Sequence, residues 1–338
     1  MESVGIVSTG VYIPEDVMTS QEIAEQAGLP IEVVEQKMGI KQKPVPGEED
    51  HTCEMGIRAA KKALEKGGID PGDIDLVIYI GEEYKEYPLW TAGIKLQEAV
   101  GAANAWAFDV AMRCGTTIMA MKVARNMMIA DPDIQTVLLA GGYRNGDFIR
   151  FDNPRTRFMY NLSAGGGAMI LQRGHEKNRV LDSSLISDGS FSEDVVVVAG
   201  GTKVPLTPDN FDQYQLDVLD PEGMKKRLEE KSMSNFLHVI REALQKSGYT
   251  QEDVSYVAML HMKRSAHEYV LKELGLDLSQ SIYLENYGHI GQMDQILSLE
   301  LAEQEGKLTD GDIVVLVSAG IGYAWGATAI KWGNHKRG

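Results

Sequence analysis

The stretch from Trp106 to Arg125 contains the residue best suited to covalent chemistry, Cys114. At this cysteine the pattern changes from an apolar strand to a helix, so the thiol is expected where a helix begins. The dipole of that helix and the guanidinium of Arg113 would both favour the thiolate over the thiol. Most lone cysteines are small buried hydrophobic residues, and that structural role is the alternative. The stretch predicts a nucleophilic cysteine at a strand-to-helix turn.

Other polar residues follow further predicted strands. Two acidic residues come directly after a buried-strand pattern at 74–81, and two histidines and a glycine follow strand patterns in the second half of the chain. In open α/β sheets, ligands bind beyond the carboxyl ends of the strands, so we expect these residues to face the same crevice as Cys114. A lone histidine is more often structural, but two facing a helix-capped cysteine indicate catalysis. The residues are Glu82, Glu83, His261, His289 and Gly320.

An internal repeat indicates the architecture. Residues 63–78 (ALEKGGIDPGDIDLVI) align with 243–258 (ALQKSGYTQEDVSYVA) at an offset of 180, with six identities in sixteen positions. A second pair, 137–142 and 315–320, aligns at an offset of 178. We therefore expect an α/β protein of two duplicated units: 1–173, which contains the cysteine, and 174–338, which contains the histidines.

Composition limits the classes of function. The chain has 338 residues, 43% of them hydrophobic, and a formal net charge of −16. An acidic surface argues against nucleic acid or an anionic membrane as the main partner. No run approaches the ~20 apolar residues of a membrane span. With two cysteines, Cys53 and Cys114, and an N-terminus that lacks a basic, apolar leader, we expect a reduced, cytoplasmic protein.

Three further features bear on local structure. Residues 4–14 predict a strand pair broken at Gly10, and 51–67 predict a helix that ends at two glycines. The loop that follows Lys37 contains a small cationic cluster with Lys41 and Lys43, which is either a solvated face or a phosphate site. The segment 200–235 is expected to be an insertion that interrupts the repeat and shapes the substrate entrance.

Several of these motifs, in this order and spacing, resemble a known family over essentially the whole chain. AFDVAMRCGTT, LHMKRSAHEY, LENYGHIGQMD and VLVSAGIGYAWGATAI are similar to 3-oxoacyl-(acyl-carrier-protein) synthase III and its relatives in the thiolase superfamily. VGIVSTGVYIPE, KPVPGEEDHT and SAGGGAMIL also resemble hydroxymethylglutaryl-CoA synthase, another member.

The resemblance implies a thiolase-like fold, layered α-β-α-β-α, and an acyl group carried on Cys114. It implies an oxyanion hole formed by the backbone amides of Cys114 and Gly320. Imidazole N–H groups of His261 and His289 would stabilise the enolate of a second thioester. It also implies a homodimer, a coenzyme A thioester as substrate with no tightly bound cofactor, delivery by CoA or acyl carrier protein, and a place in fatty acid or polyketide biosynthesis.

The sequence departs from the family at three places. His289 stands where synthase III enzymes have asparagine, although chain-elongating relatives use histidine there. An aliphatic residue near Val33 replaces the tryptophan that stacks on the CoA adenine, which departs from the CoA binding mode of synthase III. The candidate CoA-binding residues are Lys37 and Lys41 of the cationic cluster. Glu83, with Glu82 as second choice, lies where hydroxymethylglutaryl-CoA synthases have a glutamate acid/base; its alternative role is part of a charged loop.

The sequence thus predicts a condensing acyltransferase that works through acyl-Cys114. Three alternatives stay open: aldol condensation of the hydroxymethylglutaryl-CoA synthase type, acyl transfer to oxygen or nitrogen of a small molecule, and a non-catalytic thiolase-fold subunit. No metal-ligand spacing is present, since neither cysteine has a close partner and His261 and His267 are six residues apart.

Overall fold

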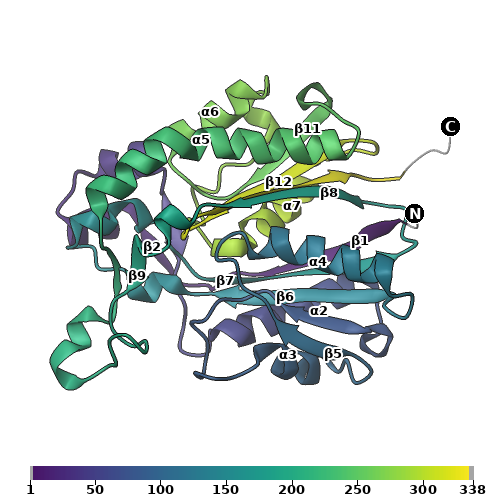
Figure 1. The fold of residues 1–338 in the computed structure, drawn as a ribbon, viewed down its shortest axis with the longest axis horizontal. Coiled ribbons are helices and arrows are strands. Elements are labelled where there is room, and N and C mark those ends of the chain that lie inside the picture. The colour runs from purple at the N-terminus through teal and green to yellow at the C-terminus, as the bar shows by residue number, and fades with distance from the viewer. Residues whose placement is uncertain (1–2, 335–338) are drawn as a thin grey trace.

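The computed structural model describes residues 3–334, in which nine strands form one mixed sheet (Figure 1). The spatial order of the strands is β11-β12-β13-β8-β1-β7-β6-β4-β5. Their bounds in chain order are β1 (Val4–Tyr12), β4 (Leu76–Tyr79), β5 (Trp106–Asp109), β6 (Thr136–Tyr143), β7 (Gly165–Arg173), β8 (Arg179–Ser187), β11 (Val254–Met259), β12 (Ile313–Gly320) and β13 (Ala324–Lys331). Two small antiparallel pairs are β2 (Val17–Thr19) with β3 (Gln42–Pro44), and β9 (Val195–Val197) with β10 (Leu216–Val218).

The internal repeat corresponds to repeated structure. Residues 63–78 run from the end of α2 (Thr52–Gly67) through a 3₁₀ turn into β4, and 243–258 run from the end of α5 (Pro221–Lys246) through a 3₁₀ turn into β11. β4 lies parallel to β6, as β11 lies parallel to β12. The strands of the two halves meet where β1 pairs with β8 at Gly5 and Arg179. The division into domains at residue 173 stays a prediction.

The strands of the N-terminal half and those of the C-terminal half form two layers, with α4 (Thr116–Ala130) and α7 (Asp294–Gln304) between them. Other helices cover the outer face of each layer, which gives the expected order α-β-α-β-α (Figure 1). α4 and α7 contact strands of both halves. α2 and α3 (Ala92–Val100) pack on the N-terminal strands, whereas α5 packs on the C-terminal ones and on α6 (Arg264–Glu273). α1 (Ser20–Ala27) lies beside the short β2 strand.

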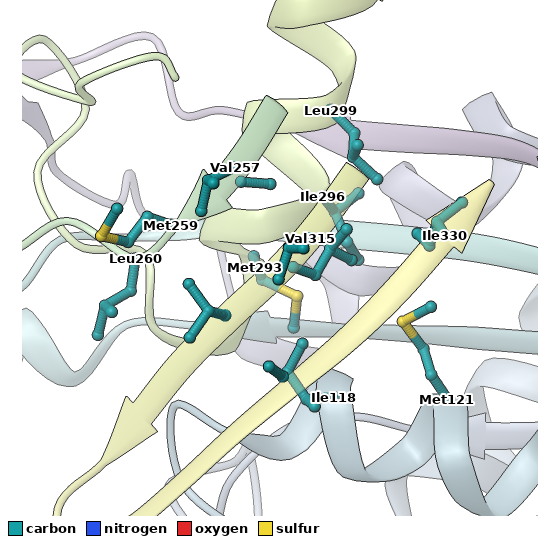
Figure 2. Packing of buried hydrophobic residues seen from close by; sticks show 14 of the residues in the cluster. Ile118, Met121, Val257, Met259, Leu260, Met293, Ile296, Leu299, Val315 and Ile330 are labelled. Carbon is teal, nitrogen blue, oxygen red and sulfur yellow. The ribbon is translucent and has the colours of Figure 1, made fainter. Parts of the chain in front are cut away.

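The side chains of the strands alternate between two hydrophobic cores. Val137 and Leu139 of β6 belong to the larger core around α4 and α7, while Leu138 and Ala140 belong to the core under α2 and α3. This alternation is the period of two that a strand buried on both faces requires. Figure 2 shows part of the larger core, with Ile118 of α4 near Met293, which precedes α7. The cores hold α4 and α7 in place, and both helices begin at the candidate active site.

Two sequence expectations for local structure were wrong. β1 is one continuous strand, because Gly10 serves close packing and not a turn: a Cβ there would lie 2.4 Å from the carbonyl oxygen of Ala59 in α2. The expected insertion at 200–235 is shorter, since α5 already begins at Pro221, with the side chain of Asp220 capping its N-terminus. The helix expected at 51–67 is confirmed as α2. Within residues 3–334, no helix has the length and apolarity needed to cross a bilayer.

Candidate active site

Cys114 lies in a tightly held turn between β5 and α4. The hydroxyl of Thr116 accepts a hydrogen bond from the amide of Met112 (2.8 Å) and donates one to the carbonyl of Arg113 (2.6 Å). Ser318 of β12 donates to the carbonyl oxygen of Cys114 at 2.6 Å. Arg113 adopts a left-handed conformation (φ 51°), which is unfavourable for a residue with a Cβ and is typical of functional turns. The turn presents a largely buried thiol two residues before α4 begins.

His289 contacts the sulfur directly. Its Nε2 lies 3.1 Å from Sγ of Cys114, and its Nδ1 lies 2.5 Å from Oδ2 of Asp294, the first residue of α7. The backbone of His289 is fixed as well, since its amide donates to Asn161 (2.8 Å) and its carbonyl accepts from Ser163 (3.0 Å). Burial alone would lower the pKa of His289, but the negative charges of Asp294 and Cys114 outweigh burial and raise it well above its ordinary value. The imidazole is therefore held as a proton donor to the sulfur.

His261 follows β11, as expected, but its ring is fully engaged with the protein. Its Nε2 donates to the carbonyl of Gly39 (3.0 Å), and its Nδ1 accepts from the side-chain amide of Asn161 (2.9 Å). Burial lowers the pKa of His261 to about 4, so the ring is neutral. Asp294 accepts from the backbone amide of His261 at 2.7 Å, which joins both histidine segments. In this arrangement His261 offers no free ring N–H to a ligand.

Gly320 lies beside the cysteine backbone at the end of β12. A Cβ at this position would lie 3.1 Å from the amide nitrogen of Cys114 and 2.8 Å from the carbonyl oxygen of Met112. Only glycine permits this approach of the two main chains. The main chain of Gly320 thus lies beside the amide of Cys114, and the oxyanion hole formed by these two residues stays a prediction.

The two glutamates after β4 occupy different environments. Glu82 is buried: its Oε2 accepts from Asn145 at 2.6 Å and lies 3.7 Å from Nη1 of Arg113. Its Oε1 is buried without a hydrogen-bond partner, and burial raises the pKa of this carboxyl group despite the charge of Arg113. Glu83, the first choice from the sequence, is two-thirds exposed, forms an ion pair with Arg113, and lines a separate open cavity of about 740 Å³. The residue beside the Cys114–His289 pair is therefore Glu82.

The three lysines after β2 do not form one cluster. Lys37 lines a cavity of about 470 Å³, whereas Lys41 forms an ion pair with Glu285 (2.6 Å) and is not among the residues that line that cavity. Lys43 is buried, donates to the carbonyls of Tyr160 (2.8 Å) and Leu162 (2.7 Å), and has its pKa lowered to about 7 by burial.

The cavity at Lys37 has a basic lining that includes one residue bonded to the histidines. Besides Lys37, its charged lining residues are Arg155, Arg157 and Lys263, and no carboxylate of the described residues lines it. Asn161, which holds the ring of His261 and the amide of His289, also lines the cavity. An anionic ligand with a flexible arm would fit such a lining. Within residues 3–334, no three His, Cys, Asp or Glu side chains are grouped so as to hold a metal ion.

Sequence reasoning did not identify Asp294 or Asn161 as site residues. Asp294 lies within LENYGHIGQMD and begins α7, but acidic residues at a helix start usually stabilise the helix end alone. Asn161 lies in an irregular segment, where no periodicity indicates which side chains face inward.

Comparisons with known proteins identify one family. The sequence model of 3-oxoacyl-[acyl-carrier-protein (ACP)] synthase III matches residues 108–189, and the model of that family's C-terminal region matches residues 244–332; together they span just over half of the chain. The beta-ketoacyl-[acyl-carrier-protein] synthase III of Roseiflexus castenholzii is 27% identical over 97% of each chain. That of Clostridium acetobutylicum is 27% identical over 98% of this chain and 99% of its own. The solved 3-oxoacyl-[acyl-carrier-protein] synthase III of Aquifex aeolicus shares the fold, with a TM-score of 0.84 at 22% identity over 97% of this chain and all of its own.

Proposed function

Because the chain belongs to the 3-oxoacyl-(acyl-carrier-protein) synthase III family of the thiolase superfamily and is a condensing acyltransferase, we propose that it loads an acyl group from acyl-CoA onto Cys114. The acyl group is then joined to a second thioester carried by CoA or acyl carrier protein, as a step in fatty acid or polyketide biosynthesis. The observation that carries this proposal is the 3.1 Å contact between Sγ of Cys114 and Nε2 of His289 at the start of α4. Both cysteines are free thiols, which suits the cytoplasmic setting that we also propose.

The first step forms the acyl enzyme. The Cys114 thiolate attacks the thioester carbonyl, and the amides of Cys114 and Gly320 stabilise the oxyanion, an effect worth about 3 kcal/mol for each donor. The C–S bond to CoA then breaks, and His289 supplies the proton that the leaving thiolate takes up. Acyl transfer leaves His289 free of the cysteine charge, with its Nε2 beside the new thioester.

The cavity at Lys37 is the proposed entrance for the carrier. Lys37, Arg157 and Lys263 would pair with phosphate groups, while Asn161, which also lines the cavity, would meet amide groups of the pantetheine arm. Lys41 is ion-paired with Glu285, so in this proposal it does not bind phosphate.

The second step joins two carbons. Loss of CO₂ from a malonyl-type thioester leaves an enolate, which attacks the carbonyl of acyl-Cys114 and expels the thiolate. Once CoA has left and Nε2 of His289 has taken up a proton again from solvent, it would donate a hydrogen bond to the enolate oxygen. His261 could do the same only after exchanging its bond to Gly39.

The unpartnered Oε1 of Glu82 favours one rival, condensation in which a carboxylate removes the proton and no CO₂ leaves. We expect instead one CO₂ for each product from malonyl donors, with Glu82→Gln costing less than about tenfold because no carboxylate base is needed. CO₂ release and product formation should be followed in wild type, Glu82→Gln and the exposed control Glu83→Gln. Turnover without CO₂, together with an inactive Glu82→Gln enzyme, would establish the rival.

We also propose a homodimer built across β5. This strand is at the edge of the sheet, and large apolar side chains near it are exposed: Trp106 on the strand, Ile94 on α3 and Leu89 in the preceding loop. An unpaired apolar edge strand invites pairing with a second copy.

Light scattering on the wild-type protein should give twice the mass of one chain. Trp106→Glu should shift the population toward monomer, because it places a charge at the edge strand. A wild-type mass equal to one chain at every concentration would contradict the dimer.

A further inference from the structure

Asp294 links the reactive pair to the protein core. It is fully buried at the first position of α7, and its carboxylate accepts three hydrogen bonds. Oδ2 accepts from Nδ1 of His289 (2.5 Å) and from the amide of His261 (2.7 Å), and Oδ1 accepts from the amide of Ile290 (2.7 Å). A buried carboxylate is costly unless its oxygens are matched by donors in this way.

The ring of His289 lies between the Asp294 carboxylate and the Cys114 sulfur. Its Nδ1 faces the carboxylate, and its Nε2 faces the sulfur at 3.1 Å. Because the carboxylate takes the hydrogen on Nδ1, the proton between Nε2 and Sγ resides on one of these two atoms. Burial lowers the pKa of His289, but the charge of Asp294 raises it and so favours the nitrogen. The backbone of His289 is fixed as well, since both of its polar groups are bonded.

We propose that Asp294 is a positioning residue that keeps the proton shared by Cys114 and His289 on the imidazole, so that the resting enzyme holds a thiolate–imidazolium pair. No bond is made or broken; one proton resides on nitrogen and not on sulfur. The inference rests on the proposed function only in taking Cys114 as the nucleophile.

The other titratable groups around His289 do not replace Asp294. Burial keeps the nearby His261 and Tyr143 neutral, since it lowers the pKa of the former to about 4 and raises that of the latter. Glu82 is the other carboxylate near the ring, but no hydrogen bond joins the two, and burial raises its pKa. The titratable groups near the ring are Cys114 before α4, Glu82 after β4, Tyr143 at the end of β6, His261 after β11 and Asp294 on α7, and Arg113 lies next to Cys114 and Glu82.

The test measures the thiolate without any substrate. An ordinary cysteine ionises near pH 8.5, so at pH 6 it is almost entirely thiol. We expect the wild-type thiolate absorbance near 240 nm, and rapid alkylation of Cys114 by iodoacetamide, to persist at pH 6. Asp294→Asn should move the appearance of the thiolate upward by at least about one pH unit and slow alkylation at pH 6 about tenfold. Cys114→Ala supplies the absorbance baseline.

Controls separate a positioning role from a structural one. Asp50→Asn removes another buried carboxylate, which is bonded to Tyr12 and Arg58, and should leave the titration unchanged. If Asp294→Asn unfolds, Asp294→Ser keeps an oxygen for the backbone amides without the charge. A folded Asp294 variant with the wild-type titration, or a wild-type thiolate that appears only above pH 8, would overturn the inference. Normal alkylation with no acyl transfer would instead count against the proposed function alone.

Discussion

Cys114→Ala is expected to abolish product formation, with a loss of at least about 10⁴-fold in turnover. The reason is that every proposed step passes through the sulfur of this residue, and no second thiol can reach the site. Cys53, the other cysteine, lies in α2 and belongs to the core under α2 and α3. Burial raises the pKa of its thiol. Product formation should be measured with an acyl-CoA and a malonyl thioester over a range of enzyme concentrations.

Cys53→Ala is the matched control, because it removes the only other thiol of the chain. It should lower stability through the cavity left in the core but keep the turnover of folded enzyme. Product formation by Cys114→Ala at a rate near wild type would exclude a cysteine-linked mechanism.

His289→Ala is expected to cost about 10²- to 10⁴-fold in condensation, the usual contribution of a positioned acid or base. Acylation should also slow at pH 7, because the contact between Nε2 and Sγ supplies the charge that holds the thiolate. The resemblance in sequence implies only enolate stabilisation for His289; its contact with the sulfur adds a role in acylation. At pH 9 acylation should partly recover, since Cys114 then ionises without its partner, while condensation should not.

Rapid quenching followed by mass spectrometry measures the two steps separately at each pH. His238→Ala, on the exposed side of α5, is the control and should match wild type in both. Unchanged acylation at pH 7 in His289→Ala would show that the imidazole does not support the thiolate.

Local patterns were enough to predict the scaffold of this site. The change of period at Cys114 places the cysteine at the turn before α4, and the internal repeat places His261 after the strand equivalent to β4. Both depend on neighbouring residues along the chain, which is what hydrophobic periodicity reports.

Contacts between distant segments could not be predicted in the same way. Glu82 and Glu83 are identical residues in adjacent positions, and only the packing of Asn145 and Arg113 decides which one is buried. Lys43 looks like a surface cation in the sequence, yet its partners Tyr160 and Leu162 are more than a hundred residues away.

The role of Asp294 also depends on a contact that local sequence patterns do not reveal. Its position at a helix start is readable from the sequence, but its bond to His289 depends on how α7 meets the loop before it. Whether His261 acts beside His289 likewise depends on its bonds to Gly39 and Asn161, which come from other parts of the fold.

The central claim, an acyl enzyme on Cys114, is tested most directly by intact mass spectrometry of the wild-type protein after incubation with a panel of acyl-CoAs. We predict the mass increase of a single acyl group per chain for at least one short or medium acyl donor, with peptide mapping that places it on Cys114. An acyl group found on Cys53 instead, or no mass increase with any of these donors, would contradict the account.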